Sequence, residues 1–423
     1  MKNLTAVVIG YGGRSSNYSK LLLKLSPDAK VAAVAEPIEA RRYDAKKDLG
    51  LSDEQLYSDW KEIAELPKIA DFAIIGTQDN MHYEPALALI EKGYNLLLEK
   101  PMAPTARECK EIAEAAERKG VEVIVCHVLR FTKFYKAIKD IIDDGTLGTV
   151  VSMECKECVG NTHQSHSFVR GNWRNTAESA PMILAKCCHD MDLIQWLLGK
   201  SCKKVQSFGS RTYFCPENRP EGAPDYCIEG CPHAAECPYN AVKLYYDDKN
   251  NHWFRGVATH HMEDRSDESV KKAITDGPYG RCVFACDNDV VDHQVVNLEF
   301  DDGCTVSFSM NAFNKGGRSI HIFGTKGELV GDMDTGKLKI FDFLTRKTSE
   351  IDTKSCGTTI VSGHGGGDGG MIQELIDYFG DGVKGKSICD ARTSYENHLI
   401  AFAAEEARLR GTVIDFDKFE EEV

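Results

Sequence analysis

The sequence has no long hydrophobic run and no excess of positive charge. No stretch approaches the length that a membrane-spanning helix needs, which argues against a membrane protein. Acidic residues number 65 against 51 basic ones, for a net charge of −14. This balance argues against nucleic acid or an anionic membrane as a partner, because phosphate binding needs basic patches. Internal repeats and low-complexity linkers are also lacking, which excludes a repeat array.

A secretory signal is lacking as well. Met1 and the three residues after it lead directly into a short apolar segment, so we expect a cytoplasmic protein. The chain has 423 residues, of which 42% are hydrophobic and 27% are charged. These values are typical of a soluble globular protein with two or three domains.

A glycine-rich turn follows the first predicted strand. Residues 5–9 form an apolar, β-branched run, as expected for a strand buried on both faces. Gly10 lets the chain turn sharply, and Gly12 lets the backbone approach a pyrophosphate without a Cβ in the way. The following helix would aim its free N–H groups at the phosphates, and Ser15 replaces the third glycine of the motif. The residues of this turn that we expect to contact a dinucleotide are Gly10, Tyr11, Gly12, Gly13 and Arg14.

The second predicted strand supports the same interpretation. Residues 31–35 are apolar and end in Glu36, where a carboxylate would bind the ribose hydroxyls. Such a carboxylate would repel a 2′-phosphate, so NAD is favoured over NADP. Arg41 and Arg42 leave NADP open, unless they are solvated charges on a helix.

Strand and helix patterns then alternate, which predicts a parallel sheet over residues 1–126. Strands are predicted at residues 70–76, 95–98 and 121–126, with helices at 83–92 and 105–118. Ligands of such sheets bind beyond the carboxyl ends of the strands. Further cofactor contacts are therefore predicted at the polar residues that follow these strands: Thr77, Asp79, Asn80, His82, Glu99 and Lys100.

The chain resembles the Gfo/Idh/MocA oxidoreductase family, named after glucose–fructose oxidoreductase and inositol dehydrogenase. The resemblance rests on the glycine turn, Glu36, residues 79–82, Glu99-Lys100-Pro101, residues 189–192 and residues 321–327. It implies an α/β fold, with an N-terminal Rossmann NAD-binding domain at 1–126. A C-terminal α/β domain with an open, mostly antiparallel sheet is implied at 127–423. The resemblance also implies a homodimer or homotetramer.

The chemistry of the second half centres on residues 182–196, which we predict to form one helix. Lys186, His189 and Asp192 follow one another at steps of three and would share a stripe, and Asp190 could pair with Lys186. A histidine with a pKa near neutrality suits the removal of a proton from a sugar hydroxyl. The alternative is a histidine satisfied inside a helix contact.

The predicted catalytic residues are Lys100, His189 and Lys186. The family pattern has an aspartate four residues before this histidine, where this chain has Ala185. The familiar Lys/Asp/His trio therefore does not carry over whole. Lys186, the next residue, would replace the aspartate as a hydrogen-bond donor to the substrate.

A polar segment with two aromatic residues, at positions 161–174, has the composition of a carbohydrate site. The alternative is a surface loop with capping polar residues. Arg130, Asp192 and His364 are also expected near the substrate, since the glycine-rich stretch around His364 resembles a family loop beside the active site. The predicted substrate-binding residues are Arg130, His163, His166, Arg170, Trp173, Arg174, Asp192 and His364.

Sixteen cysteines form a separate feature, and the lack of a secretory signal disfavours disulfides. Cys215, Cys227, Cys231 and Cys237, separated by eleven, three and five residues, lie in a Gly/Pro-rich insertion at about 213–242. We predict a structural zinc site that helps to fold an insertion without a core of its own. An iron–sulfur cluster and free buried thiols are the alternatives, and the Cys282/Cys286 pair could instead supply ligands.

The sequence therefore favours a NAD-dependent oxidoreductase that oxidises a secondary alcohol of a sugar, cyclitol or glycoside. One alternative is a glycosidase or lyase that retains its NAD and works by transient oxidation and elimination. A second alternative is a non-catalytic NAD-binding regulator.

Overall fold

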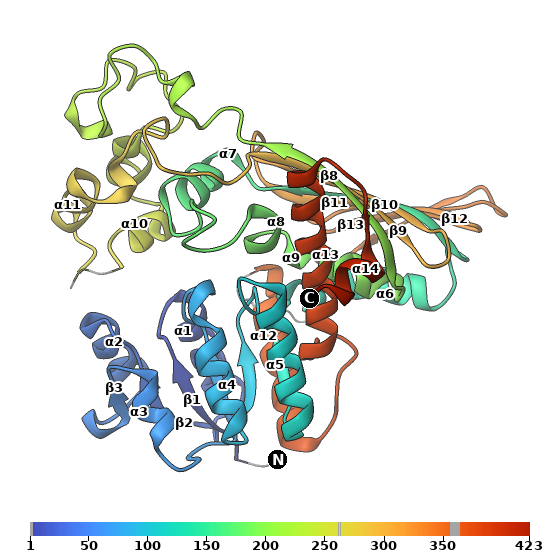
Figure 1. The fold of residues 1–423 in the computed structure, drawn as a ribbon, viewed down its shortest axis with the longest axis horizontal. Coiled ribbons are helices and arrows are strands. Elements are labelled where there is room, and N and C mark those ends of the chain that lie inside the picture. The colour runs from blue at the N-terminus through green and yellow to red at the C-terminus, as the bar shows by residue number, and fades with distance from the viewer. Residues whose placement is uncertain (1–2, 261, 263, 356–363) are drawn as a thin grey trace.

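Two β-sheets organise the structure, a computed structural model that describes residues 3–260, 262, 264–355 and 364–423. Figure 1 shows the smaller sheet, in blue to cyan, below the larger one. Helices from the end of the chain, in orange and red, lie between and beside the two sheets (Figure 1).

The first sheet has six parallel strands in the order β3-β2-β1-β4-β5-β6. Its strands are β1 (Thr5–Ile9), β2 (Lys30–Ala35), β3 (Leu56–Tyr57), β4 (Phe72–Ile75), β5 (Asn95–Leu98) and β6 (Val123–Val125). The helices between them are α1 (Gly13–Leu25), α2 (Glu39–Leu49), α3 (Trp60–Glu65), α4 (Tyr83–Glu91) and α5 (Ala106–Lys119). The strand order reverses between β1 and β4, which is where sheets of this kind bind dinucleotides. The predicted Rossmann architecture is confirmed.

Local sequence explains these elements. Strand β4 is buried along its whole length, which fits its run of apolar residues. Helix α5 buries Cys109, Ile112, Ala113 and Ala116, a stripe with helical spacing. The Thr105 side chain accepts a hydrogen bond from the Glu108 N–H and caps the start of this helix.

The second sheet has nine strands in the order β14-β13-β12-β11-β7-β10-β9-β8-β15. Within this second sheet, among the described strands, β7 and β10 alone pair in parallel, and the other neighbours are antiparallel. The expected open, mostly antiparallel sheet is therefore confirmed. The strands are β7 (Val150–Cys158), β8 (Cys202–Ser210), β9 (His293–Phe300), β10 (Thr305–Asn311), β11 (Gly317–Gly324), β12 (Gly327–Asp332), β13 (Lys337–Asp342), β14 (Thr348–Asp352) and β15 (Ile414–Asp415).

One face of this sheet is buried and the other is open. On β10, Val306, Phe308 and Met310 are buried and alternate with more exposed residues. Helices α9 (Cys188–Leu198) and α13 (Ala391–Arg410) pack against the sheet. Before the sheet, η3 (Val128–Phe131) and α6 (Lys133–Asp143) connect the two halves of the molecule.

The insertion between β8 and β9 runs from 211 to 292, and the predicted Cys-rich part at about 213–242 lies within it. It contains α10 (His252–Ala258), α11 (Asp267–Asp276) and the short helices η5 (Pro216–Asn218), η6 (Cys227–Glu229), η7 (Val242–Asp247) and η8 (Pro278–Gly280). Apolar side chains such as Tyr245, Phe254 and Ile274 form a buried cluster within it. Apart from Ala241, the buried members of this cluster lie at 245–279, beyond the predicted Cys-rich insertion at about 213–242, so the expectation that the insertion lacks a core of its own stays a prediction.

The last helices return to the first sheet. Helix α12 (Gly367–Asp381) packs against α1, and α13 packs against α5. Met371 and Leu375 of α12 belong to the same apolar cluster as Leu4 and Val8 of the first sheet. The division into domains at residues 1–126 and 127–423 stays a prediction. Helix α12, from the C-terminal part of the chain, packs on the first sheet.

The remaining short elements are η1 (Asp53–Gln55), η2 (Asp79–Met81), α7 (Asn161–His163), η4 (Gln164–Arg170), α8 (Met182–Ala185), η9 (His364–Gly366) and α14 (Phe416–Glu421). In the part of the chain that the structure describes, no helix is both long enough and apolar enough to cross a membrane.

Candidate active site

The glycine turn between β1 and α1 leaves room for a ligand. Gly10 has a φ of +78°, and a Cβ there would lie 3.0 Å from the Gly76 carbonyl oxygen, so this glycine is required by the fold. Gly12 has a φ of −77°, and among the described atoms its Cβ would meet nothing closer than 3.9 Å. The protein itself therefore has room for a side chain at Gly12. A glycine at this position would be needed if a dinucleotide pyrophosphate binds against the backbone there, because a Cβ would block it.

Helix α1 approaches strand β4 closely at Ser15. This serine is fully buried, and a Cβ on Gly76 would lie 2.1 Å from its hydroxyl oxygen. The two small residues thus bring the start of α1 against the end of β4, as the substitution of Ser15 for the third glycine predicts.

Glu36 lies across from the turn, at the end of β2. Its carboxylate accepts hydrogen bonds from the backbone N–H groups of Tyr11 (2.7 Å) and Ile38 (2.9 Å). Arg41 Nη1 lies 3.9 Å from the same carboxylate. Arg42 donates to the backbone carbonyls of Glu36 and Pro37. The carboxylate is therefore held in place beside the glycine turn.

The polar residues after β4 hold loops together. His82 is buried, and its Nδ1 lies 2.8 Å from the Pro101 carbonyl oxygen. Asp79 accepts hydrogen bonds from Trp173 Nε1 (2.9 Å) and Ser179 Oγ (3.0 Å), which connects the first sheet to the segment after η4. Thr77 Oγ1 donates to the Met81 carbonyl, and Asn80 is exposed.

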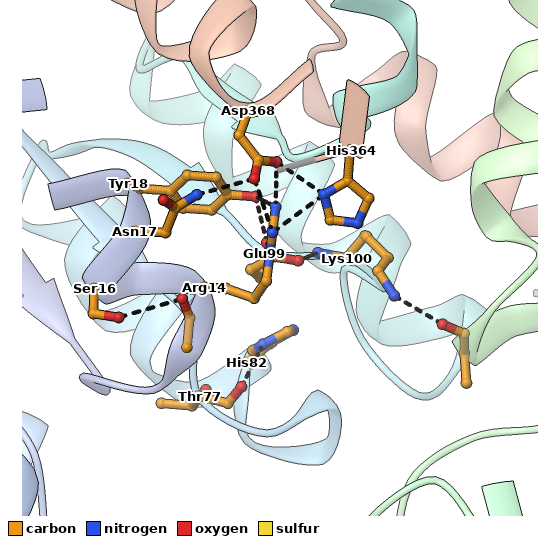
Figure 2. Close-up of polar contacts among 12 residues, drawn as sticks. Arg14, Ser16, Asn17, Tyr18, Thr77, His82, Glu99, Lys100, His364 and Asp368 are labelled. Carbon is orange, nitrogen blue, oxygen red and sulfur yellow. Dashed lines mark hydrogen bonds and ion pairs between the residues drawn. The ribbon is translucent and has the colours of Figure 1, made fainter. Parts of the chain in front are cut away.

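Arg14 is the centre of a charged network at the start of α1. Figure 2 shows its guanidinium pointing toward Glu99, Tyr18, Asp368 and His364. Arg14 Nε donates to Glu99 Oε1 over 2.9 Å and Nη2 donates to Asp368 Oδ1 over 2.7 Å. Although burial alone would raise the pKa of Asp368, hydrogen bonds from His364 and Arg14 hold it at about 2. The network joins α1, the end of β5 and the start of α12.

His364 belongs to this network and has a left-handed backbone, with a φ of +53°. Its Nδ1 lies 3.1 Å from Asp368 Oδ1 and 3.3 Å from Arg14 Nη1. A non-glycine residue in this conformation is strained, and such strain concentrates at functional sites.

Lys100 reaches from the end of β5 to the second half of the chain. Its Nζ donates to the Ala185 carbonyl oxygen over 2.9 Å, as the dashed line from Lys100 in Figure 2 shows. That carbonyl is the last of α8, and the helix breaks before α9 begins at Cys188. The break leaves the Ala185 carbonyl available to the lysine.

His189 lies in the first turn of α9 and is almost fully buried. Burial, and next the charge of Lys100, hold the pKa of His189 well below its usual range, so the imidazole is neutral near pH 7. Within the described residues, its Nδ1 has no hydrogen-bond partner. The His127 and His364 rings lie 5.9 Å and 6.5 Å from the His189 ring, between centroids.

The break after α8 corrects two predictions about Lys186. Because α8 ends at Ala185, Lys186 does not share a helix stripe with His189 and Asp192. Lys186 Nζ pairs with Glu157 Oε1 at 3.4 Å, and Asp190 binds Arg318 at 2.9 Å, instead of pairing with Lys186.

Glu157 and Arg318 were not predicted from the sequence. Arg318 also pairs with Glu157, at 2.6 Å, so two cations and two carboxylates form one group. Burial raises the pKa of Asp190, and the Arg318 charge opposes that rise. The alternation of buried and exposed residues along β7 and β11 could have placed Glu157 and Arg318 on the buried face of the sheet. No local sequence signal indicates that they lie near His189.

Arg130 and Asp192 bind one another in the interior. Arg130 Nε and Nη2 donate to the two Asp192 oxygens over 2.8 Å and 2.6 Å, and both residues are at most 2% exposed. Asn397 Nδ2 donates to the same carboxylate. This arrangement argues against direct contact of either side chain with a substrate.

The predicted carbohydrate segment divides between two environments. His166 stacks between Phe254 (4.1 Å) and Tyr279 (5.0 Å), and burial lowers its pKa to about 3. His163 contacts Trp253, which is 52% exposed, and burial lowers the pKa of His163 to about 2.

The two arginines of this segment also lie in different environments, one buried and one near the surface. Arg170, the last residue of η4, is buried against the insertion and donates to the carbonyls of Tyr239 and Arg281. Arg174 pairs with Asp287 at 3.0 Å and with Glu178 at 3.1 Å near the surface. Of the residues predicted in this segment, His163 lies near Lys186. The charge of Lys186 further lowers the pKa of His163.

The predicted four-cysteine set is not gathered in the structure. The fifteen described cysteines are free thiols, and Cys356 lies outside the described residues. In the described ranges, one group of three or more metal-binding side chains has its ligand atoms within 4.8 Å of one another: His127, Asp192 and Cys389. Arg130 occupies both oxygens of that aspartate, which disfavours a cation there. The described geometry therefore gives no support to the zinc prediction with Cys215, Cys227, Cys231 and Cys237 as one ligand set.

Two sequence models of the Gfo/Idh/MocA family match the chain. The model described as an oxidoreductase family with a NAD-binding Rossmann fold matches residues 4–127. The model described as the C-terminal alpha/beta domain of the family matches residues 139–416.

Individual relatives are more distant. YteT of Bacillus subtilis is 25% identical over 315 residues, 72% of each chain. An inositol 2-dehydrogenase of Streptomyces avermitilis is 28% identical over 203 residues, which are 48% of this chain and 55% of that protein. The chain thus spans about half the length of the inositol dehydrogenases that it matches.

Solved structures share the fold. Levoglucosan dehydrogenase in complex with NADH and levoglucosan has a TM-score of 0.71 at 17% identity, covering 98% of this chain and 100% of that one. An oxidoreductase from Agrobacterium radiobacter in complex with NAD+, L-tartaric acid and magnesium has a TM-score of 0.70 at 14% identity, covering 99% of both chains.

The strand order of the first sheet and the two family models define an oxidoreductase with a NAD-binding Rossmann domain and a C-terminal α/β domain. The chain belongs to the Gfo/Idh/MocA oxidoreductase family, since the two family models together match nearly all of it.

Proposed function

We propose that this protein oxidises a secondary alcohol of a sugar, cyclitol or glycoside with NAD. The observation that carries the proposal is the approach of Lys100 to the helix break just before His189. The two side chains come from different halves of the chain and converge beyond the carboxyl end of β5. The names of the inositol and levoglucosan dehydrogenases support an alcohol of this class.

The two residues would divide the proton chemistry between them. Lys100 donates a hydrogen bond to the reacting oxygen, which stabilises the negative charge that develops there. His189 is neutral because of burial and the Lys100 charge, so it can accept the hydroxyl proton. The nicotinamide, when bound, accepts the hydride from the same carbon atom.

The turn fits NAD. Gly12 leaves space where the pyrophosphate would approach, and Glu36 would hold the ribose hydroxyls. The Glu36 carboxylate favours NAD over NADP, whose 2′-phosphate it would repel. Arg41, 3.9 Å from that carboxylate, is the residue that would favour NADP instead.

Substitution of the two residues tests the assignment. We expect Lys100→Ala and His189→Ala each to lower kcat by about 10²–10⁴-fold, the usual contribution of a positioned acid or base. NAD binding, followed by calorimetry, should remain. His321→Ala, on β11, is the matched control and should keep the parent rate. A normal rate in either active-site variant would contradict the assigned roles.

Glycoside cleavage with retained NAD is the second candidate. The observation that favours it is the long insertion, whose exposed Trp253 stands beside His163 and could bind a second sugar ring. Nitrophenyl glycosides separate the two reactions. Release of nitrophenol without net NADH formation would favour cleavage, and NADH formation from free sugars would favour the dehydrogenase.

We further propose that copies of the chain associate through the open face of the larger sheet as a homodimer or homotetramer. Phe208, Val295 and Val330 are exposed on that face. Light scattering should give a mass of two or four chains, and Phe208→Lys should lower it. A monomer at micromolar concentration would contradict this proposal.

A further inference from the structure

Arg170 is a buried cation without a carboxylate partner in the described part of the chain. Its Nε donates to the Arg281 carbonyl over 2.8 Å, and its Nη2 donates to the Tyr239 carbonyl over 2.7 Å and to Cys227 Sγ over 3.8 Å. Its Nη1 is buried, and no described residue accepts a hydrogen bond from it. A buried charge of this kind is costly unless a negative group lies beside it.

Each of these three contacts lies at or beside a cysteine. Cys227 is contacted directly, Arg281 precedes Cys282, and Tyr239 follows Cys237 by two residues. The guanidinium therefore lies where three thiol-bearing segments meet.

A short antiparallel pairing aligns two of those segments. Tyr226 and Arg281 form a β-bridge, and the Cys282 N–H donates to the Asp225 carbonyl over 2.7 Å. Cys227 and Cys282 thus begin two adjacent turns. Cys231 follows Cys227 after Gly230, whose φ of +85° reverses the chain, and the separation of three residues is typical of zinc-binding turns.

The neighbours of each sulfur atom distinguish possible ligands from other thiols. The sulfur of Cys237 lies near enough to those of Cys227 and Cys231, and that of Cys282 near enough to that of Cys227, for their charges to interact. The backbone N–H groups of Tyr239 and Phe284 point at the sulfurs of Cys237 and Cys282, as they would at thiolates. Cys286 Sγ instead donates to the Cys282 carbonyl over 3.3 Å. Cys215 Sγ lies near the Thr212 and Tyr213 carbonyls and accepts a hydrogen bond from Asn218 Nδ2 over 3.2 Å, and the charges that act on it come from Glu217 and Arg211 instead of from another cysteine.

We propose that Cys227, Cys231, Cys237 and Cys282 bind one zinc ion as thiolates beside Arg170. Four thiolates and one Zn²⁺ carry a net charge of −2, which offsets the buried guanidinium. Arg170 donates to a ligand sulfur and so acts as a positioning residue. This set differs from the sequence prediction in one ligand, because Cys282 replaces Cys215.

Binding requires a rearrangement of the turns. As described, no three thiol sulfurs lie within 4.8 Å of one another, which is farther apart than the ligands of one tetrahedral ion. Cys227, Cys231 and Cys237 are partly exposed and Cys282 is buried, so the proposal requires the turns of the first three to move toward Cys282 when zinc binds.

Elemental analysis of the full-length protein, purified under reducing conditions, tests the proposal. We expect about one zinc per chain, as in other closed thiolate sites. Cobalt substitution should give the visible absorption of a tetrahedral thiolate site. Cys282→Ser should lose at least nine-tenths of the zinc, whereas the matched variant Cys215→Ser should keep it.

A third variant tests the role of the guanidinium. Arg170→Gln should keep all four ligands but release zinc to a chelator at least tenfold faster. In the parent protein, a mercurial reagent that modifies thiols should release the ion, which checks the site without any substitution.

Three results would overturn the proposal. The first is protein without zinc, and the second is iron with inorganic sulfide in place of zinc. The third is equal loss of zinc in the Cys215 and Cys282 variants, with circular dichroism showing that both remain folded.

Discussion

Single side chains in this protein depart from their ordinary chemistry because of burial. His127, His163, His166, His189 and His398 all have pKa values lowered mainly by desolvation. Of these, His189 is the one whose neutrality serves the proposed reaction. The others hold a neutral imidazole for packing or hydrogen bonding, as His166 does between Phe254 and Tyr279.

His166 provides a test of this effect on stability. Its pKa is about 3 in the folded protein and about 6.5 in an unfolded chain. Below pH 6.5 the unfolded chain therefore binds a proton that the folded protein does not, and stability falls as the pH is lowered. Between pH 7.5 and 5.5 this costs the parent about 1.4 kcal/mol.

We expect the His166→Phe variant to lack that loss. Denaturant unfolding of parent and variant at the two pH values measures the difference directly. If the free-energy gap between them were the same at pH 7.5 and 5.5, His166 would not be neutral in the folded state.

At the scale of elements, local sequence predicts strands of the first sheet, whereas it does not predict the break in the helix at residues 182–196 of the second domain. Strands β1 and β5 begin and end where the sequence places them, because short apolar runs between turn signals are local. The break between α8 and α9 has no local signal. At this break, Lys100 donates a hydrogen bond to the Ala185 carbonyl, although the two residues are 85 positions apart in the sequence.

The candidate site divides in the same way. Lys100 and His189 could be predicted because they follow a strand end and a family motif. The partners of Lys186, Arg130 and Asp192 could not, because they depend on how the two sheets pack together. The proposed zinc site differs from the predicted set at Cys215, because the spacing of cysteines along the chain does not show which turns become neighbours.

The glycine turn gives a prediction at this scale. Gly12→Ala should fold with unchanged stability, because its Cβ meets no described atom within 3.9 Å. It should nevertheless weaken NAD binding by at least tenfold, an order of magnitude that corresponds to about 1.4 kcal/mol. Gly380→Ala, in α12, where a Cβ would meet no described atom outside the helix closer than 4.0 Å, is the matched control and should bind NAD normally.

Thermal unfolding and calorimetric titration with NAD together check this prediction. Equal NAD affinity in Gly12→Ala and the parent would mean that the turn does not hold the pyrophosphate.

For the whole molecule, the Arg14 network determines how the two ends of the chain meet. It joins the start of α1 to the start of α12, which lies more than 350 residues later in the sequence. Asp368, at the centre of this contact, is 1% exposed in its side chain.

Asp368→Asn should weaken this junction. We expect a loss of about 1–2 kcal/mol in stability, less than for a fully buried charged hydrogen bond because Arg14 is partly exposed. The parent's own stability should fall as the pH drops below about 4, since the Asp368 pKa is about 2 when folded. The variant should lack that acid-dependent loss, as chemical unfolding at pH 3 and pH 6 would show. The Glu374→Gln variant, which breaks the more exposed pair with Lys136, is the control.

The position of α12 has a consequence for biosynthesis. The earliest strands to leave the ribosome complete their hydrophobic packing with Met371 and Leu375, which are translated near the end. The nascent amino-terminal half must therefore wait, partly uncovered, until nearly the entire polypeptide has emerged. A premature stop codon before α12 would consequently damage the coenzyme-binding half, although every residue of that half had been made.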